Sequence, residues 1–288
     1  MQLLHCLPRF LLRHKTIDFL CKIGLQNRVS EIEFNNGART IIDLSDPEPR
    51  NVFIKGEFEQ HFFTIARSFL GEKGVFFDLG ANVGFCTFGM LPSRPSAQYH
   101  LFEANPQLVS LLGKSIELHE SHDLLIGHGC LSDQDGSSNF CIEKKQSGQS
   151  HVSNGKGEGQ AVRNILLDDY CESMGIKSID FAKIDLEGYE LPCLKGWKNF
   201  LSEGLVGALY VEVIPENQFR YGIDPRELLG FLESFGYKLF FCKEQDLASS
   251  PSGNGSMCEI GVHPPLPASP FKARHYPTNF STDILACL

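Results

Sequence analysis

The feature that most constrains the fold is a regular alternation of short apolar stretches with amphipathic stretches between residues 75 and 242. Short apolar runs are typical of buried strands, whereas apolar residues three or four positions apart indicate helices. We predict strands at Val75–Gly80, Gln98–Glu103, Leu124–His128, Ile179–Asp185, Val206–Val213 and Tyr237–Cys242. Helices are expected between them, at 83–91, 106–120, 167–174, 189–201 and 225–235. This order predicts an α/β fold with a mostly parallel sheet and helices on both faces.

The N-terminal residues are expected to add smaller elements. Asn36-Gly37 lies between two short strand-like stretches and predicts a β-hairpin, because these residues accept the positive φ of a tight turn. Residues 1–24 are both apolar and basic, which favours an amphipathic helix packed on the domain; contact with a membrane surface or a partner is the alternative. Charged residues and Pro8 break the apolar runs, so we expect neither a signal peptide nor a transmembrane segment.

These patterns predict two parts of the chain. Residues 1–50 form a helix-and-hairpin extension, and residues 51–288 form the α/β domain, which begins with a helix at 57–70. The polar, glycine-rich stretch 146–159 predicts a loop. The stretch 248–270 predicts a loop-rich C-terminal end around a short candidate strand at 257–262.

Composition narrows the class of function. The formal net charge is -9 and no dense run of Lys and Arg is present, so a nucleic-acid partner is not expected. The ten cysteines are scattered singly without a Cys-x-x-Cys pair, which argues against a structural zinc site. Free cysteines in apolar runs favour a reducing, cytoplasmic compartment.

Four predicted strands end in or next to an acid, namely Asp78, Glu103, Asp185 and Glu212. The carboxyl ends of parallel strands lie on one rim of a sheet, and ligands bind beyond that rim. A single acid at a strand end is commonly a helix cap or a solvated loop residue, but four on one rim favour a binding site. Their carboxylates would accept hydrogen bonds from hydroxyls, an amine or water.

The turn after the first of these strands indicates which ligand binds. A dinucleotide turn reads Gly-x-Gly-x-x-Gly, whereas here Asp78 replaces the first glycine and would repel a diphosphate. A sulfonium with an amino-acid tail and a ribose suits this turn, so we expect S-adenosylmethionine. Gly80 and Gly84 would let the ligand approach the backbone, and Glu103 would accept from both ribose hydroxyls. NAD enzymes also keep an acid at that place, so Glu103 alone does not decide.

A second motif, Lys183-Ile-Asp-Leu-Glu-Gly-Tyr-Glu190 followed by Leu194-Lys-Gly196, completes a pattern. Together with DLGANVG (78–84) and FEANP (102–106), it makes the chain resemble the FkbM family of methyltransferases over about residues 50–245. Weaker matches lie at 131–136, 167–169 and 211–213. The resemblance implies a class I methyltransferase (Rossmann-like) fold with a seven-stranded sheet. It also implies O-methylation, with S-adenosylmethionine as donor, of a hydroxyl on a carbohydrate or secondary metabolite.

The resemblance also assigns residues by position. Asp78, Gly80, Asn82 and Gly84 form the donor turn, Glu103 holds the ribose, Ser132 and Asp133 meet the adenine edge, and Asp185 and Glu187 lie beside the reacting centre. The segment Ser150-His-Val152 departs from the paired serines usual in the family, which leaves a role for His151 open.

Methyl transfer to an alcohol needs positioning and removal of a proton. Asp185 is the first candidate for the base, and alternation along the strand places Lys183 on the same face as a neutralising partner. For Asp185 and Glu187 the alternative is capping of the next helix. Glu212 is a third candidate catalytic acid. Asp185 and Glu212, together with Glu187, are candidate ligands for a divalent metal such as magnesium.

Other residues and other functions stay open. His128 and His151 are alternative bases, although a buried, hydrogen-bonded role is expected for His128, and Glu59 is a further candidate near the donor pocket. A non-catalytic S-adenosylmethionine-binding or scaffold module is the alternative from a different class. A nicotinamide-dependent oxidoreductase is a second alternative. A small-molecule or glycan acceptor is the expected partner, and a homo-oligomer is possible.

Overall fold

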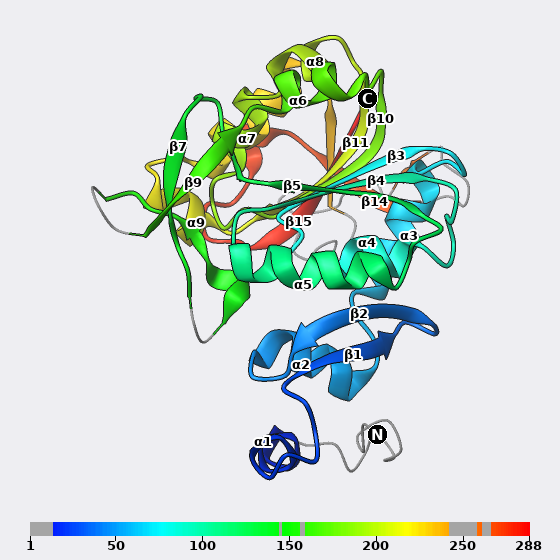
Figure 1. Cartoon of the computed structure of the whole chain (residues 1–288). Coiled ribbons are helices and arrows are strands. Elements are labelled where there is room, and N and C mark those ends of the chain that lie inside the picture. The colour runs from blue at the N-terminus through cyan, green and yellow to red at the C-terminus, as the bar shows by residue number, and fades with distance from the viewer. Residues whose placement is uncertain (1–13, 144–145, 156–158, 242–257, 261–265) are drawn as a thin grey trace.

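The computed structural model describes residues 14–143, 146–155, 159–241, 258–260 and 266–288. Its main feature is a nine-stranded sheet with helices on both faces (Figure 1). The strand order is β13-β14-β12-β15-β11-β10-β3-β4-β5. The strands are β3 (Val75–Leu79), β4 (Gln98–Glu103), β5 (Asp123–His128), β10 (Ile179–Ile184), β11 (Val206–Val213), β12 (Lys238–Phe241), β13 (Cys258–Ile260), β14 (Leu266–Phe271) and β15 (Thr282–Cys287).

The order in which the chain adds strands to the sheet changes side at β3: β4 and β5 follow on one side, and β10 and β11 on the other. Strand β3 pairs in parallel with both β10 and β4, and the parallel region extends to β11 on one side and to β5 on the other. Because successive βα units run in opposite directions from β3, a crevice opens beyond its carboxyl end. The expected α/β class I methyltransferase fold is confirmed.

The expected number of strands is wrong. β15 lies antiparallel between β11 and β12, and an antiparallel β14–β13 pair extends the edge beyond β12. Neither β14 nor β15 is predicted by the sequence pattern. β14 contains Pro267 and Pro270, and proline argues against a strand except near an edge.

Two hydrophobic cores lie on opposite faces of the sheet, as the alternation of side chains along each strand requires. In β3, Phe76 packs into one core and Phe77 into the other. The first core is covered by α3 (Gln60–Phe69), α4 (Phe85–Met90) and α5 (Pro106–Glu117). The second is covered by α6 (Leu167–Met174), α7 (Glu190–Lys195), α8 (Lys198–Ser202) and α10 (Pro225–Ser234). The helix expected at 189–201 is divided between α7 and α8.

The N-terminal elements lie beneath α4 and α5 in Figure 1. They are α1 (His14–Lys22), β1 (Val29–Phe34), β2 (Ala38–Asp43) and α2 (Pro47–Lys55). The hairpin predicted around Asn36-Gly37 is confirmed. Its Thr40 hydroxyl donates to the Val83 carbonyl at 2.7 Å, and hairpin residues share the first core with α4 and α5. Residues 1–13 of the predicted N-terminal helix lie outside the described residues, and α2 is not predicted.

A second, small sheet interrupts the alternation and was also missed. It has the order β6-β9-β7-β8 and consists of β6 (Cys130–Leu131), β7 (Ser137–Cys141), β8 (His151–Val152) and β9 (Gln160–Ile165). The stretch expected as a loop at 146–159 therefore contains the short 3-10 helix η3 (Ser147–Gln149) and the strand β8. Of the stretch expected to be rich in loops, 248–270, residues 248–257 and 261–265 lie outside the described residues, and β13 lies within the candidate strand predicted at 257–262.

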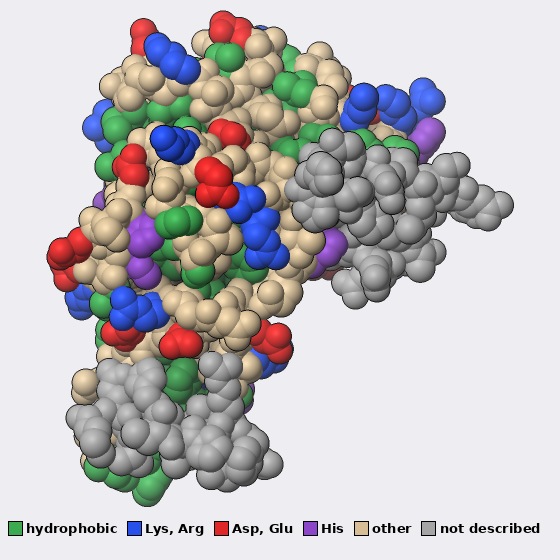
Figure 2. All heavy atoms as spheres, turned by 90° about the vertical axis from the view of Figure 1, so that its right-hand side faces the viewer, with side chains coloured by type: hydrophobic (Ala, Val, Ile, Leu, Met, Phe, Trp, Pro, Cys, Tyr) green, Lys and Arg blue, Asp and Glu red, His purple; other side chains and the backbone are tan. Residues whose placement is uncertain are grey.

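Figure 2 shows one face of the molecule, on which Lys and Arg side chains are interspersed with Asp and Glu rather than gathered in one patch. In the part of the chain that the structure describes, no helix has the length and apolar character needed to cross a membrane.

Candidate active site

A cavity of about 590 Å³ opens at the carboxyl ends of the central strands. Its lining includes the four strand-end acids, Asp78 from β3, Glu103 from β4, Asp185 after β10 and Glu212 from β11. The prediction that these acids share one rim is thereby confirmed. The volume is within the usual range for a small-molecule site.

Asp78 is fixed to the helix that follows its strand. Its Oδ2 accepts hydrogen bonds from the Thr87 hydroxyl at 2.7 Å and from the Thr87 backbone N–H at 3.2 Å. Its Oδ1 is buried and has no hydrogen-bond partner among the residues that the structure describes. Burial raises the pKa of Asp78, although Lys183 and Thr87 oppose the shift. A buried oxygen without a partner in the lining of a cavity is suited to accept a hydrogen bond from a ligand.

The glycines of the turn are required by the protein itself. Gly80 has φ +88°, and a Cβ there would collide with the Asp185 carbonyl oxygen at the end of the neighbouring strand. Gly84 has φ +78°, and its Cβ would collide with the Phe88 ring. Gly80 lines the cavity, whereas Gly84 is not among the lining residues. The close approach at these glycines is therefore between protein segments, not only between ligand and backbone as expected.

Glu103 is held by two backbone groups. Its Oε2 accepts from the Asn82 N–H at 2.8 Å, and its Oε1 accepts from the Asn105 N–H at 2.8 Å. Burial raises the pKa of Glu103 to about 7 despite these hydrogen bonds. Asn82 itself has φ +52°, a conformation that asparagine tolerates better than most residues. Each Glu103 oxygen retains a second lone pair that can accept from a ligand hydroxyl.

Ser132 and Asp133, predicted at the adenine edge, are not among the lining residues. Ser132 is buried and its hydroxyl accepts from the Gln134 N–H at 3.3 Å, while Asp133 is exposed. The neighbouring Cys130 and Leu131 line the cavity instead, with Phe102. The contact of Ser132 and Asp133 with adenine stays a prediction.

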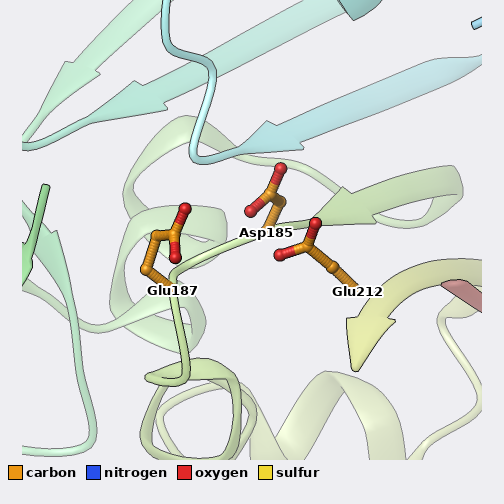
Figure 3. Close-up of side chains that lie close together, drawn as sticks. All are labelled: Asp185, Glu187 and Glu212. Carbon is orange, nitrogen blue, oxygen red and sulfur yellow. The ribbon is translucent and has the colours of Figure 1, made fainter. Parts of the chain in front are cut away.

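Two of these acids, Asp185 and Glu212, come together with the carboxyl group of Glu187 at the ends of β10 and β11 (Figure 3). One ligand atom from each of Asp185, Glu187 and Glu212 lies within 4.8 Å of the others. Lys183 Nζ forms an ion pair with Asp185 Oδ2 at 2.7 Å, as the alternation along the strand predicts. Asp185, Glu187 and Glu212 are the acid cluster of the cavity.

Different partners give these carboxyl groups different pKa values. Burial raises the pKa of Asp185, but the Lys183 ammonium overcomes this effect and holds it below the usual range. Burial and the charge of Asp185 raise the pKa of Glu212 well above its usual value. A hydrogen bond between the two side chains contributes to both shifts, lowering the pKa of Asp185 and raising that of Glu212. Burial, followed by the charge of Asp185, raises the pKa of Glu187 to about 8.

The capping alternative for Asp185 and Glu187 is not found. Helix α7 has Tyr189 at its N-cap and no side-chain cap. Glu190 instead closes this loop, because its Oε1 accepts from the backbone N–H groups of Leu186 and Gly188. Glu187 has φ +53° and accepts from Asn217 Nδ2 at 2.7 Å. The loop thus directs the Glu187 carboxyl into the cavity while Glu190 performs the structural role.

The alternative bases differ in position. His128 is exposed and is not among the lining residues, so the expected burial of His128 is wrong. His151 lines the cavity, with its Nδ1 2.9 Å from the Gln149 carbonyl oxygen. Glu59 is exposed and is not among the lining residues. The lining also includes Glu48 from α2 and the whole segment 146–152, regions expected to contribute to the acceptor pocket although, apart from His151, none of these residues was singled out.

Comparison with known proteins identifies relatives of the chain. A family model described as methyltransferase FkbM domain matches residues 78–239. The chain is 27% identical over 161 residues to the hexuronic acid methyltransferase AglP of Haloferax volcanii, a match covering 56% of this chain and 62% of that protein. It is 24% identical over 188 residues to the 2-O-methyltransferase NoeI of Sinorhizobium fredii, covering 56% of this chain and 72% of that protein.

Among solved structures, the precorrin-6y C5,15-methyltransferase of Geobacter metallireducens is 13% identical with a TM-score of 0.41, covering 81% of this chain and 90% of that chain. The family model spans more than half of the sequence, from the donor turn to the last strand of the βα alternation. The match covers less than two thirds of the length of AglP, but the family model shows that the chain belongs to the FkbM methyltransferase family.

Proposed function

We propose that this protein transfers the methyl group of S-adenosylmethionine to a hydroxyl of a carbohydrate or a related secondary metabolite. The observation that carries the proposal is the single cavity into which four neighbouring strands direct their terminal acids. Two curated relatives are named as a hexuronic acid methyltransferase and a 2-O-methyltransferase, which supports a sugar-like acceptor.

The donor end of the cavity fits the methyl donor by its chemistry. Asp78 Oδ1, buried and without a partner, would accept from the amino group of the donor. Glu103, ionised on binding, would accept from the ribose hydroxyls. The apolar residues Phe102, Cys130 and Leu131 would contact the adenine ring. When bound, S-adenosylmethionine supplies an activated methyl group on a positively charged sulfur.

The acid cluster forms the acceptor end in this proposal. The ionised Asp185, held by Lys183, provides a negative charge near the sulfonium, and Glu187 and Glu212 provide hydrogen-bonding groups for the acceptor. Charges and dipoles that the folded protein already holds in place stabilise the transition state more than flexible ones do, because they need no reorganisation during the reaction. Asp185 is a weaker base than the sequence suggested, since its pKa is lowered.

The acid cluster is also the predicted site for a divalent cation. Three carboxylate oxygens in close proximity suit magnesium. A cation there would have to compete with the Lys183 ammonium, which lies 2.7 Å from Asp185. We therefore propose that Lys183 supplies the local positive charge, and magnesium binding stays a prediction to be tested.

Calorimetric titration with S-adenosylmethionine, S-adenosylhomocysteine and NAD tests the donor. Binding of both adenosyl compounds and not of NAD is the expected result. Binding of NAD alone would replace the proposal with an oxidoreductase, and no binding would refute the donor site. A panel of hexoses, hexuronic acids and nucleotide sugars, with formation of S-adenosylhomocysteine as the readout, then tests the acceptor class. Donor binding without turnover on the whole panel would favour the non-catalytic module.

A further inference from the structure

Helix α2 brings one more acid into the cavity. Glu48 lies in the first turn of α2, within the region expected to be an extension of the domain. Its side chain nevertheless lines the same cavity as Asp78 and Asp185. Since α2 precedes the entire βα alternation, this contribution to the site arises only in the folded chain.

Hydrogen bonds fix Glu48 beside the donor turn. Asp46 caps α2 by accepting from the Glu48 N–H at 3.2 Å, and its other oxygen accepts from the Ser147 N–H at 2.9 Å. The Ser147 hydroxyl in turn donates to Asn82 Oδ1 at 3.4 Å. A Cβ on Gly148 would collide with Glu48 Oε2 and would lie 3.5 Å from Asn82 Nδ2. The Glu48 carboxyl is therefore held between the donor turn and the segment 146–152.

The Glu48 carboxyl has no hydrogen bond or ion pair within the described ranges of the chain. The charged groups that act on it are Asp185, Asp46, Lys183 and Glu59, and it acts in turn on Glu187. The neighbouring segment contributes two further titratable groups to the cavity lining, Glu143 and His151. Burial, followed by the charge of Asp185, raises the pKa of Glu48 to about 7.

The three carboxyl groups of the acid cluster are already engaged. Asp185 is paired with Lys183 at 2.7 Å, and Glu187 accepts from Asn217 at 2.7 Å. Glu212 shares a hydrogen bond with Asp185. A base must be free to receive a proton, and it is most effective when its pKa lies near the working pH. Glu48 meets both conditions.

We propose that Glu48 is the catalytic residue that accepts the proton of the acceptor hydroxyl, on a site shared between α2 and the carboxyl ends of the sheet. The inference rests on the proposed function. As the O–CH₃ bond forms, the S–CH₃ bond breaks and its electron pair stays on sulfur, giving neutral S-adenosylhomocysteine. The hydroxyl proton passes to the Glu48 carboxylate, which becomes a carboxylic acid, so charge and atoms balance.

Turnover of the Glu48→Gln variant is the first test, with the best acceptor of the panel. Loss of a positioned base typically costs about 100-fold or more in kcat. The acid limb of the kcat profile at saturating S-adenosylmethionine, where the effect of Glu103 on donor affinity does not enter, is expected near pH 7 in the wild type and should disappear. Glu48→Asp should keep the limb with reduced kcat. Glu57→Gln is the matched control, because Glu57 is an exposed acid just beyond α2 and is not among the lining residues.

Proton release on donor binding is the second test and needs no acceptor. Calorimetric titrations at pH 7 in buffers of different ionisation enthalpy give the number of protons released on binding. They are made with S-adenosylmethionine and with S-adenosylhomocysteine, which differ by the charge on sulfur. That charge favours the ionised form of nearby acids, so the wild type should release more protons with S-adenosylmethionine. In Glu48→Gln this excess should fall by about half a proton, because a group of pKa about 7 is half protonated at pH 7.

The outcomes separate the two proposals. If the wild type binds neither adenosyl compound, the proposed function fails and the role of Glu48 fails with it. If the wild type binds them but Glu48→Gln keeps either the full proton excess of the wild type or the acid limb of the kcat profile, Glu48 is only a structural neighbour of Gly148. A fall of about half a proton together with loss of the acid limb in Glu48→Gln, with neither change in Glu57→Gln, supports the assignment.

Discussion

Asp78 provides the sharpest test of the donor site, through the Asp78→Asn variant. In the wild type, Thr87 occupies Oδ2 and leaves the buried Oδ1 for the ligand. The variant keeps the shape but removes the charge, and a hydrogen bond to a charged group contributes about 1.5–3 kcal/mol. The Kd of the donor should therefore rise by roughly 10- to 150-fold. Because the amino group is common to both adenosyl compounds, both affinities should fall by the same factor.

Calorimetry on folded protein measures this effect, with Asp180→Asn as the control. Asp180 lies at the opposite end of the neighbouring strand, where its Oδ2 accepts from the Val75 N–H at 2.9 Å, and it is not among the lining residues. This control should change stability without changing the Kd. If Asp78→Asn binds S-adenosylmethionine within twofold of the wild type, Asp78 does not contact the donor and the reasoning from its unpaired oxygen is refuted.

Three further outcomes are expected. First, the affinity for S-adenosylmethionine should fall about tenfold per pH unit below about pH 7, because Glu103 must lose its proton before it can accept hydrogen bonds from the ribose hydroxyls. The Glu103→Gln variant should bind the donor weakly, and its affinity should depend less on pH. The same raised pKa means that Glu103 binds its proton more tightly folded than unfolded, so it makes the unliganded protein less stable as pH rises from about 4.5 to 7, which thermal unfolding at pH 5 and 8 would show. Second, Gly80→Ala should lower the free energy of unfolding by more than about 2 kcal/mol, because Gly80 has a positive φ and the added Cβ would collide with the Asp185 carbonyl. The control Gly113→Ala lies in open space on α5 and should raise the free energy of unfolding by up to about 1 kcal/mol. Denaturant titrations measure both values, and equal effects would contradict the packing argument. Third, turnover should persist in EDTA if Lys183 supplies the positive charge beside Asp185, and loss of activity restored by magnesium would establish the metal site instead.

The sequence by itself determined the central architecture and the donor half of the site. Strands β3 and β11 are mostly apolar on both faces, and such strands are typical of a sheet that is covered on both faces. The acids at their ends then have to meet, because parallel strands place their carboxyl ends on one rim. Local pattern and topology rules are sufficient for these features, which explains why Asp78, Glu103, Asp185 and Glu212 were found together.

The edge of the sheet was not determined in this way. Strand β15 follows a long segment without clear periodicity, and its prolines make β14 resemble a loop. Both strands pair antiparallel with strands already in the sheet, so their formation depends on those partners more than on their own sequence pattern.

The tertiary structure alone decided which acids are free and which are paired. Nothing in Asp46-Pro-Glu48-Pro distinguishes an acid that caps a helix from an acid that lines a cavity. Glu48 precedes β3, the first strand of the site, and only its contact with Gly148 and its place in the lining show its role. Likewise, Asp185 and Glu187 look equivalent in the motif, but burial and the Lys183 ammonium move their pKa values in opposite directions. Protonation states depend on the charges and dipoles within a few ångströms of each group, and these neighbours come from segments that only folding brings together.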